Sequence, residues 1–134
     1  MTDPLTELLA IHAAEHQAHR DTDVTALLAH QGEPFVTVGQ GRVDTATRAE
    51  VAAHFTRYVA AAVYHEYVDL EPPRATVSAD GTLGWVISRT RVRRTQTMPD
   101  GTAVERAFVY AGFMGYAREG GRWVRVANVS TFEP

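Results

Sequence analysis

Residues 83–132 read LGWVISRTRVRRTQTMPDGTAVERAFVYAGFMGYAREGGRWVRVANVSTF, and this stretch decides the fold. It contains three long runs rich in β-branched and aromatic residues, at 83–97, 103–118 and 122–132. A turn signal precedes each run, as consecutive antiparallel hairpins require: Asp80-Gly81, Pro99-Asp100-Gly101 and Glu119-Gly120-Gly121. Strands this long bend, and Gly112 and Gly115 are candidates for a kink or bulge. The stretch therefore predicts a meander of long antiparallel strands.

The residues before this meander predict helices and shorter strands. Apolar periodicity predicts helices over 4–20, over about 22–29 and from Thr47, where Thr47 and Glu50 form a capping box. Short β-prone runs lie at 35–38, 63–70 and 75–78, and Pro72-Pro73 places the second of them at an edge or a bend. Helices that cover one face of an antiparallel sheet make an α+β fold, which we expect to be one domain over residues 1–134.

Composition excludes several classes of chemistry. The 134 residues carry a net charge of −3, which gives no basic face for nucleic acid, and no apolar run is long enough to span a membrane. The chain has no cysteine, which removes disulfides and zinc–thiolate sites, and no lysine, which removes Schiff-base chemistry. Asp3 and Glu7 stand where a secretory signal would be basic, so we expect a cytoplasmic protein. The chain has no lysine and no glycine-rich nucleotide motif, so we expect no cofactor.

Four segments resemble the nuclear transport factor 2-like superfamily and its SnoaL-like members. They are DVTALLA at 23–29, the glycine loop and helix start at 39–55, SADGTLGW at 78–85 and GRWVRV at 121–126. The resemblance implies three N-terminal helices on a strongly curved sheet that forms a cone with a central pocket. It also implies a small apolar or amphipathic ligand, cofactor-free isomerisation, cyclisation or dehydration, and a homodimer through the outer sheet face. The alternative is a ligand-binding or dimerisation module without turnover.

The ketosteroid isomerase pattern within this superfamily is not matched. Those enzymes are expected to hold an aspartate base just after the first strand, but here residues 37–41 read TVGQG and the next carboxylate is Asp44. Their first-helix tyrosine has no counterpart either, since the nearest polar residue is His12.

Histidines at helical spacing are the main candidates for chemistry. His12, His16 and His19 share the apolar face of the first helix, where one of them could act as a general base in the pocket. His12 and His16 could also bind a metal, but the spacing fixes no third ligand; His54, His65 or Glu66 could supply one only if the fold brings it near. The alternative interpretation is that the helix face becomes amphipathic towards its end, where these histidines are half-exposed or hydrogen-bonded and have no functional role. We predict His16 as the catalytic residue, because it lies near the middle of the stripe, and no metal.

Further pocket residues are expected from the aromatic and polar set. Arg89 is the member of the Arg89, Arg91 and Arg93 stripe closest to an apolar segment, although such a stripe equally marks a solvated face. Glu66 faces inward only in one of two strand registers, and we favour its exposure. The predicted ligand-binding residues are His12, Phe55, Tyr58, Tyr64, Trp85, Arg89, Tyr110 and Asn128.

Overall fold

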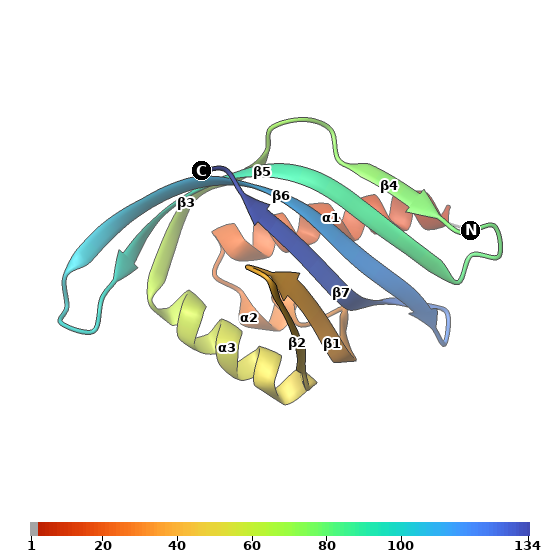
Figure 1. Ribbon diagram of the computed structural model, residues 1–134, viewed down its shortest axis with the longest axis horizontal. Coiled ribbons are helices and arrows are strands. Elements are labelled where there is room, and N and C mark those ends of the chain that lie inside the picture. The colour runs from red at the N-terminus through yellow and green to blue at the C-terminus, as the bar shows by residue number, and fades with distance from the viewer. Residues whose placement is uncertain (1–2) are drawn as a thin grey trace.

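The computed structural model describes residues 3–134, which form three helices and one seven-stranded sheet (Figure 1). The elements follow in the order α1 Pro4–Arg20, α2 Val24–Leu27, β1 Gln31–Gly39, β2 Arg42–Ala46, α3 Arg48–Ala60, β3 Ala62–Asp69, β4 Arg74–Val77, β5 Leu83–Thr97, β6 Ala103–Glu119 and β7 Arg122–Phe132. The sheet order is β2-β1-β7-β6-β5-β3, with β4 paired to β5, and only the β1–β7 pair is parallel. The predicted α+β class is therefore confirmed: helices pack on a curved, mainly antiparallel sheet, which is not closed.

The helices begin and the turns form where the sequence predicts. Asp3 caps α1 through the Thr6 N–H, and the Thr47–Glu50 capping box starts α3. Gly81 and Gly101 take positive φ in the first two hairpin turns, where residues with a side chain would be strained. Two expectations were wrong: α2 is a single turn rather than eight residues, and β2 fills a region read as a loop.

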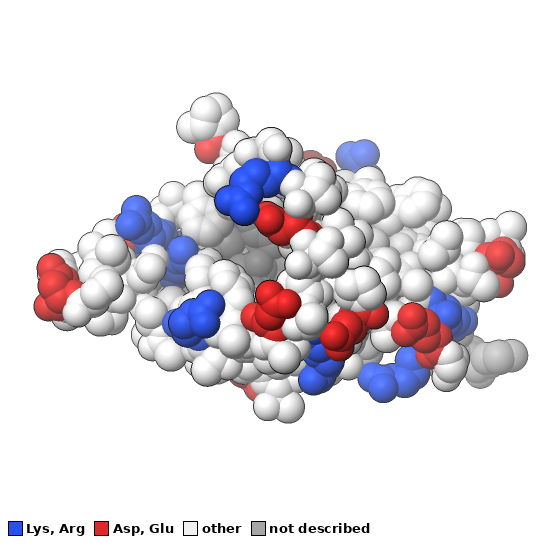
Figure 2. All heavy atoms as spheres, turned by 60° about the horizontal axis from the view of Figure 1, so that its bottom comes forward, with Lys and Arg blue, Asp and Glu red and all other residues white. Residues whose placement is uncertain are grey.

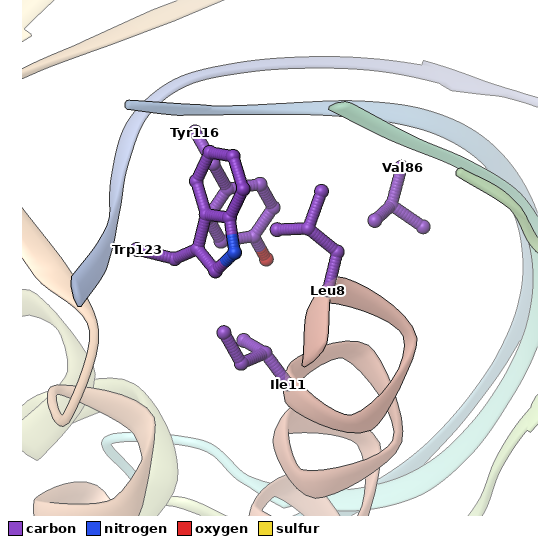
Figure 3. Packing of buried hydrophobic residues seen from close by; sticks show 5 residues of the cluster. All are labelled: Leu8, Ile11, Val86, Tyr116 and Trp123. Carbon is purple, nitrogen blue, oxygen red and sulfur yellow. The ribbon is translucent and has the colours of Figure 1, made fainter. Parts of the chain in front are cut away.

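The concave face of the sheet packs on α1 (Figure 3). Leu8 and Ile11 of α1 meet Val86, Tyr116 and Trp123 in one buried cluster. Gly84 allows this close approach, because a Cβ there would lie 2.7 Å from Leu8 Cδ1. The buried face of α1 includes Ile11 and Glu15 beside the predicted His12 and His16, while Leu5 is exposed.

Two strands contain irregularities that turn particular side chains inward. The register of β3 against β5 shifts between Tyr64 and Glu66, so that Tyr64 and Tyr67 are both buried. The register of β6 against β7 shifts between Gly115 and Tyr116, opposite the predicted position Gly115, but the extra residue is Val126 of β7 rather than a residue of β6. None of the helices among residues 3–134 is long and apolar enough to cross a membrane.

Candidate functional site

A cavity of about 510 Å³ lies between the concave sheet face, α1 and α3. Figure 2 shows the molecule hollowed near the centre of one face, with acidic and basic side chains both bordering the hollow. Much of the wall is apolar, with Phe35, Val51, Phe55, Val92 and Phe108 among its residues. A concave apolar wall with a few polar groups is the usual form of a small-molecule site.

Two histidines of α1 that line the cavity meet one carboxylate, which lies outside the lining residues. His12 and His16 are both buried, and their ring centroids lie 4.1 Å apart. His12 Nε2 lies 2.9 Å and 3.1 Å from the two carboxylate oxygens of Asp69, the last residue of β3. His16 Nε2 lies 3.2 Å from the nearer of these oxygens, Oδ1. One carboxylate oxygen is thus shared by two imidazoles.

His16 is held neutral by its surroundings. Its Nε2 lies 3.3 Å from the Thr90 hydroxyl, and its ring packs edge-on against Tyr67. Burial, followed by the neighbouring His12, lowers the pKa of His16 to about 4, although Asp69 acts in the opposite direction.

His19 has a tautomer that can be read from its hydrogen bond. Its Nδ1 lies 2.7 Å from the backbone carbonyl of Glu15, which can only accept, so Nδ1 carries the proton. The neutral ring therefore has its lone pair on Nε2, which has no hydrogen-bond partner among residues 3–134. Burial lowers the pKa of His19 to about 4. His19 lines the cavity as a neutral imidazole with an available acceptor nitrogen.

Two tyrosines place a pair of hydroxyls beside these rings. Tyr67 Oη and Tyr110 Oη lie 2.8 Å apart, and the Tyr67 ring stacks on His19 at 4.1 Å. Both tyrosines line the cavity, and burial raises the pKa of each above its ordinary value. Because one hydroxyl of the pair donates to the other, the second keeps a proton to donate to a ligand oxygen.

A buried ion pair forms another part of the wall. Arg125 Nη1 lies 3.2 Å from Glu15 Oε2, and the Tyr116 hydroxyl donates to Glu15 Oε1 at 3.3 Å. Arg125 Nη2 donates to the Leu27 carbonyl at 2.6 Å, whereas its Nε has no partner among the described residues. This pair neutralises both charges inside the fold.

Six of the predicted site residues line the cavity together. They are His12, His16, Phe55, Tyr58, Tyr110 and Asn128. They come from α1, α3, β6 and β7, so the fold gathers groups that are far apart in the sequence.

Three other predicted residues lie outside the cavity. Trp85 and Arg89 are on the outer sheet face, where Trp85 stacks on Phe113 and Arg89 pairs with Glu133 at 3.0 Å. The alternation of β5 explains their position, because the buried residues of this strand are Gly84, Val86, Thr90 and Val92. Tyr64 is buried beside the cavity, and its hydroxyl accepts from Arg94 at 3.3 Å.

None of the candidate third metal ligands joins His12 and His16 among the described residues, although His54 lines the cavity from α3. His65 bonds to Thr95 at 2.7 Å, Glu66 lies 3.9 Å from Arg93, and His54 stacks on Tyr58. Asp44 pairs with Arg42 at the exposed strand β2.

Sequence reasoning missed Asp69, Tyr67, Glu15 and Arg125 as site residues. Regular alternation would place Tyr67 on the sheet face opposite to that of Tyr64, and Arg125 on the face opposite to that of Asn128. The irregularities in β3 and β7 bring each pair to the same face, and the sequence alone does not reveal them. Asp69 ends a strand next to Pro72-Pro73, which reads as the start of a loop.

The sequence matches no family model and no curated protein. Its structure is similar to a ketosteroid isomerase-like protein from Erwinia carotovora atroseptica, with a TM-score of 0.75, 19% identity and 100% of both chains covered. A nuclear transport factor 2-like protein from Cytophaga hutchinsonii aligns with a TM-score of 0.73 and 14% identity, over 98% of this chain and 100% of that one. Another, of unknown function, from Pseudomonas putida aligns with a TM-score of 0.65 and 19% identity, over 95% and 84%. This chain therefore has the nuclear transport factor 2-like superfamily fold, as the resemblance of its sequence predicts.

Proposed function

We propose that this protein binds one small, mostly apolar molecule in the cavity and transfers a proton on it. The reaction class would be isomerisation, cyclisation or dehydration, with no cofactor in the proton-transfer step. One observation carries the proposal: acceptor and donor groups meet at one wall of an otherwise largely apolar cavity of about 510 Å³. A titratable base beside hydroxyl donors in a water-poor pocket is the arrangement that acid/base catalysis needs.

His19 is the base that the geometry favours. Sequence periodicity favours His16, but His16 Nε2 already faces Asp69 and Thr90. His19 Nε2 carries a lone pair and has no partner among the described residues. The hydroxyl of Tyr110 or Tyr67 would donate to the ligand oxygen on which negative charge develops, as an oxyanion-hole donor does.

Hydrogen–deuterium exchange on a simple ketone tests this proposal without the natural substrate. The probe is 2-tetralone, a bicyclic ketone whose C1 protons are acidic because they lie between a carbonyl and a ring. In D₂O, His19 Nε2 would take a C1 proton, a tyrosine hydroxyl would stabilise the enolate oxygen, and a deuteron would return to C1. We expect the protein to accelerate this exchange, followed by proton NMR, beyond the rate in buffer.

Two variants separate the roles in that assay. His19→Asn keeps a donor towards the Glu15 carbonyl but removes Nε2, so we expect roughly 100-fold slower exchange. Tyr110→Phe removes one hydroxyl, and we expect roughly tenfold slower exchange. His65→Asn, on an exposed site, is the matched control and should leave the rate unchanged. Saturable binding of the ketone with no accelerated exchange would leave a binding module and reject the catalytic part.

We also propose that two copies associate through the outer sheet face. Leu83, Trp85, Ile87 and Phe113 are apolar and exposed there, and Trp85 stacks on Phe113 across β5 and β6. A contiguous apolar patch on a sheet face is typical of an interface between proteins. Such a dimer leaves the concave face and its cavity accessible.

Solution mass measures this association directly. Light scattering after gel filtration should give twice the 14.7 kDa chain mass, and Trp85→Glu should give the single-chain mass. The matched control Val43→Glu places a charge at an exposed apolar residue of β2 and should keep the dimer. A wild-type chain that remains a monomer at high concentration would reject the outer-face dimer.

A further inference from the structure

We infer that His12, His16 and Asp69 form a binding site for one divalent transition-metal ion. Their ligand atoms all lie within 4.8 Å of one another. His12 Nε2 and His16 Nε2 lie 2.9 Å and 3.2 Å from the same Asp69 oxygen. The inference goes beyond the proposed function and does not depend on it.

Local structure explains why the three groups face one point. Residues four apart on an α-helix lie on the same face, one turn apart, so His12 and His16 present adjacent rings from α1. Asp69 stands opposite Thr90 in the β3–β5 ladder, and α1 packs across both strands. The site is therefore built by one helix and two strands rather than by a mobile loop.

The distances fit a coordinated ion. Imidazole nitrogens and carboxylate oxygens bind zinc and similar ions at about 2.0–2.2 Å. Two ligands that are neighbours around such an ion are about 3.0 Å apart in octahedral geometry and about 3.4 Å in tetrahedral geometry, from that bond length. The 2.9 Å and 3.2 Å separations are close to these values, so small side-chain adjustments would admit an ion.

The donor set selects a class of ion. Two imidazoles with one carboxylate suit zinc, iron(II), cobalt(II) or manganese(II), whereas calcium and magnesium prefer oxygen ligands. Three protein ligands leave further positions for water or a ligand oxygen, as catalytic metal sites do. Nearby, the Thr90 hydroxyl is 3.3 Å from His16 Nε2 and can bond to a coordinated water.

Asp69 supplies the negative charge that favours a cation at this place, while the nearby Arg20 opposes it. The nearby Arg20 guanidinium donates to the Tyr67 carbonyl, and Arg125 is paired with Glu15. Asp69 is the one carboxylate in contact with the two imidazoles among residues 3–134, so a divalent ion would leave the site with a single positive charge. Both histidines line the cavity, whereas Asp69 is exposed and lies outside the lining, so the ion would sit between the cavity and the solvent.

Metal titration of the untagged, chelator-treated chain of 134 residues tests the inference. Cobalt(II) and zinc(II) salts are the probes, measured by calorimetry and by the visible absorption of bound cobalt. We expect one equivalent to bind with micromolar affinity or better. His12→Gln and Asp69→Asn should each weaken binding at least about 100-fold, while the exposed-site control His65→Gln should not change it. Circular dichroism of each variant shows whether it is folded.

Two outcomes would overturn the metal site. One is binding well below one equivalent per chain in the wild-type protein. The other is unchanged affinity in folded His12→Gln and Asp69→Asn proteins, which would place the ion elsewhere. Either result leaves the ketone exchange assay unaffected, because that assay is run on chelator-treated protein. Failure of the exchange assay likewise leaves metal titration, which uses no organic ligand, unaffected.

Discussion

Glu15→Ala is expected to destabilise the protein by about 3–5 kcal/mol, because it leaves the Arg125 guanidinium buried without a counter-charge. The two side chains are only 10% and 4% exposed, and their closest atoms lie 3.2 Å apart. The substitution also removes the acceptor of the Tyr116 hydroxyl. Urea denaturation at neutral pH measures the change, and a fall in Tm of more than about 10 °C should accompany it.

The control for this prediction is a pair of the same kind in a more exposed place. Arg118 Nη2 lies 2.6 Å from Glu7 Oε2, and both side chains are 25–29% exposed. Glu7→Ala should therefore cost no more than about 1 kcal/mol, since solvent screens the remaining charge.

A double variant separates charge from packing. Glu15→Met with Arg125→Met removes both charges and keeps long side chains, so it should recover at least half of the stability lost in Glu15→Ala. A cost below about 1 kcal/mol for Glu15→Ala alone would contradict the prediction. It would show that water in the cavity solvates the Arg125 guanidinium, so that Arg125 does not need Glu15 as a counter-charge.

The fold could be predicted because its signals are local. Each hairpin has a turn glycine, and each of the two long helices has a cap that four or five consecutive residues reveal. Strand β2 was missed because it has no buried residue, so no alternation of apolar and polar residues marks it.

The site could be predicted only in part, because it depends on strand register. His12, His16, Phe55, Tyr58, Tyr110 and Asn128 were placed in the pocket from periodicity and resemblance, and all six line the cavity. A one-residue irregularity precedes Tyr67 in β3, and another lies between Arg125 and Asn128 in β7; such a shift reverses the facing of the side chains beyond it. The inward placement of Trp85 and Arg89 was wrong because the outer face of β5 is the more apolar face near the start of the strand.

Asp69 shows a different limit of sequence reasoning. Its contact with His12 joins residues 57 positions apart, through the packing of α1 on β3. Nothing in the spacing of either segment specifies that packing, so the carboxylate that completes the cluster became visible only in three dimensions.

Acidification is expected to destabilise the protein through His19. Its pKa is about 4 in the folded chain and 6.5 in an unfolded one, mainly because burial disfavours the charged ring. As pH falls below 6.5 the unfolded chain takes up a proton that the folded chain refuses until about pH 4. The free energy of unfolding therefore falls with pH across this window, by up to about 1.4 kcal/mol per pH unit and roughly 3 kcal/mol in total. Above pH 6.5 both states are neutral and this contribution is fully present.

Comparison with His19→Asn isolates this effect from other groups that titrate in the same range. Urea denaturation of chelator-treated protein from pH 7 to pH 4.5 should show a steeper loss of stability for the wild type than for His19→Asn. The exposed His65→Asn protein should keep the wild-type slope, because the His65 side chain is exposed and bonds to the Thr95 hydroxyl at the surface. Equal slopes for wild type and His19→Asn would mean that the folded chain protonates His19 as readily as the unfolded one. A neutral His19 at pH 5 is also what the proposed base requires, so the same measurement bears on the proton-transfer role assigned to its Nε2.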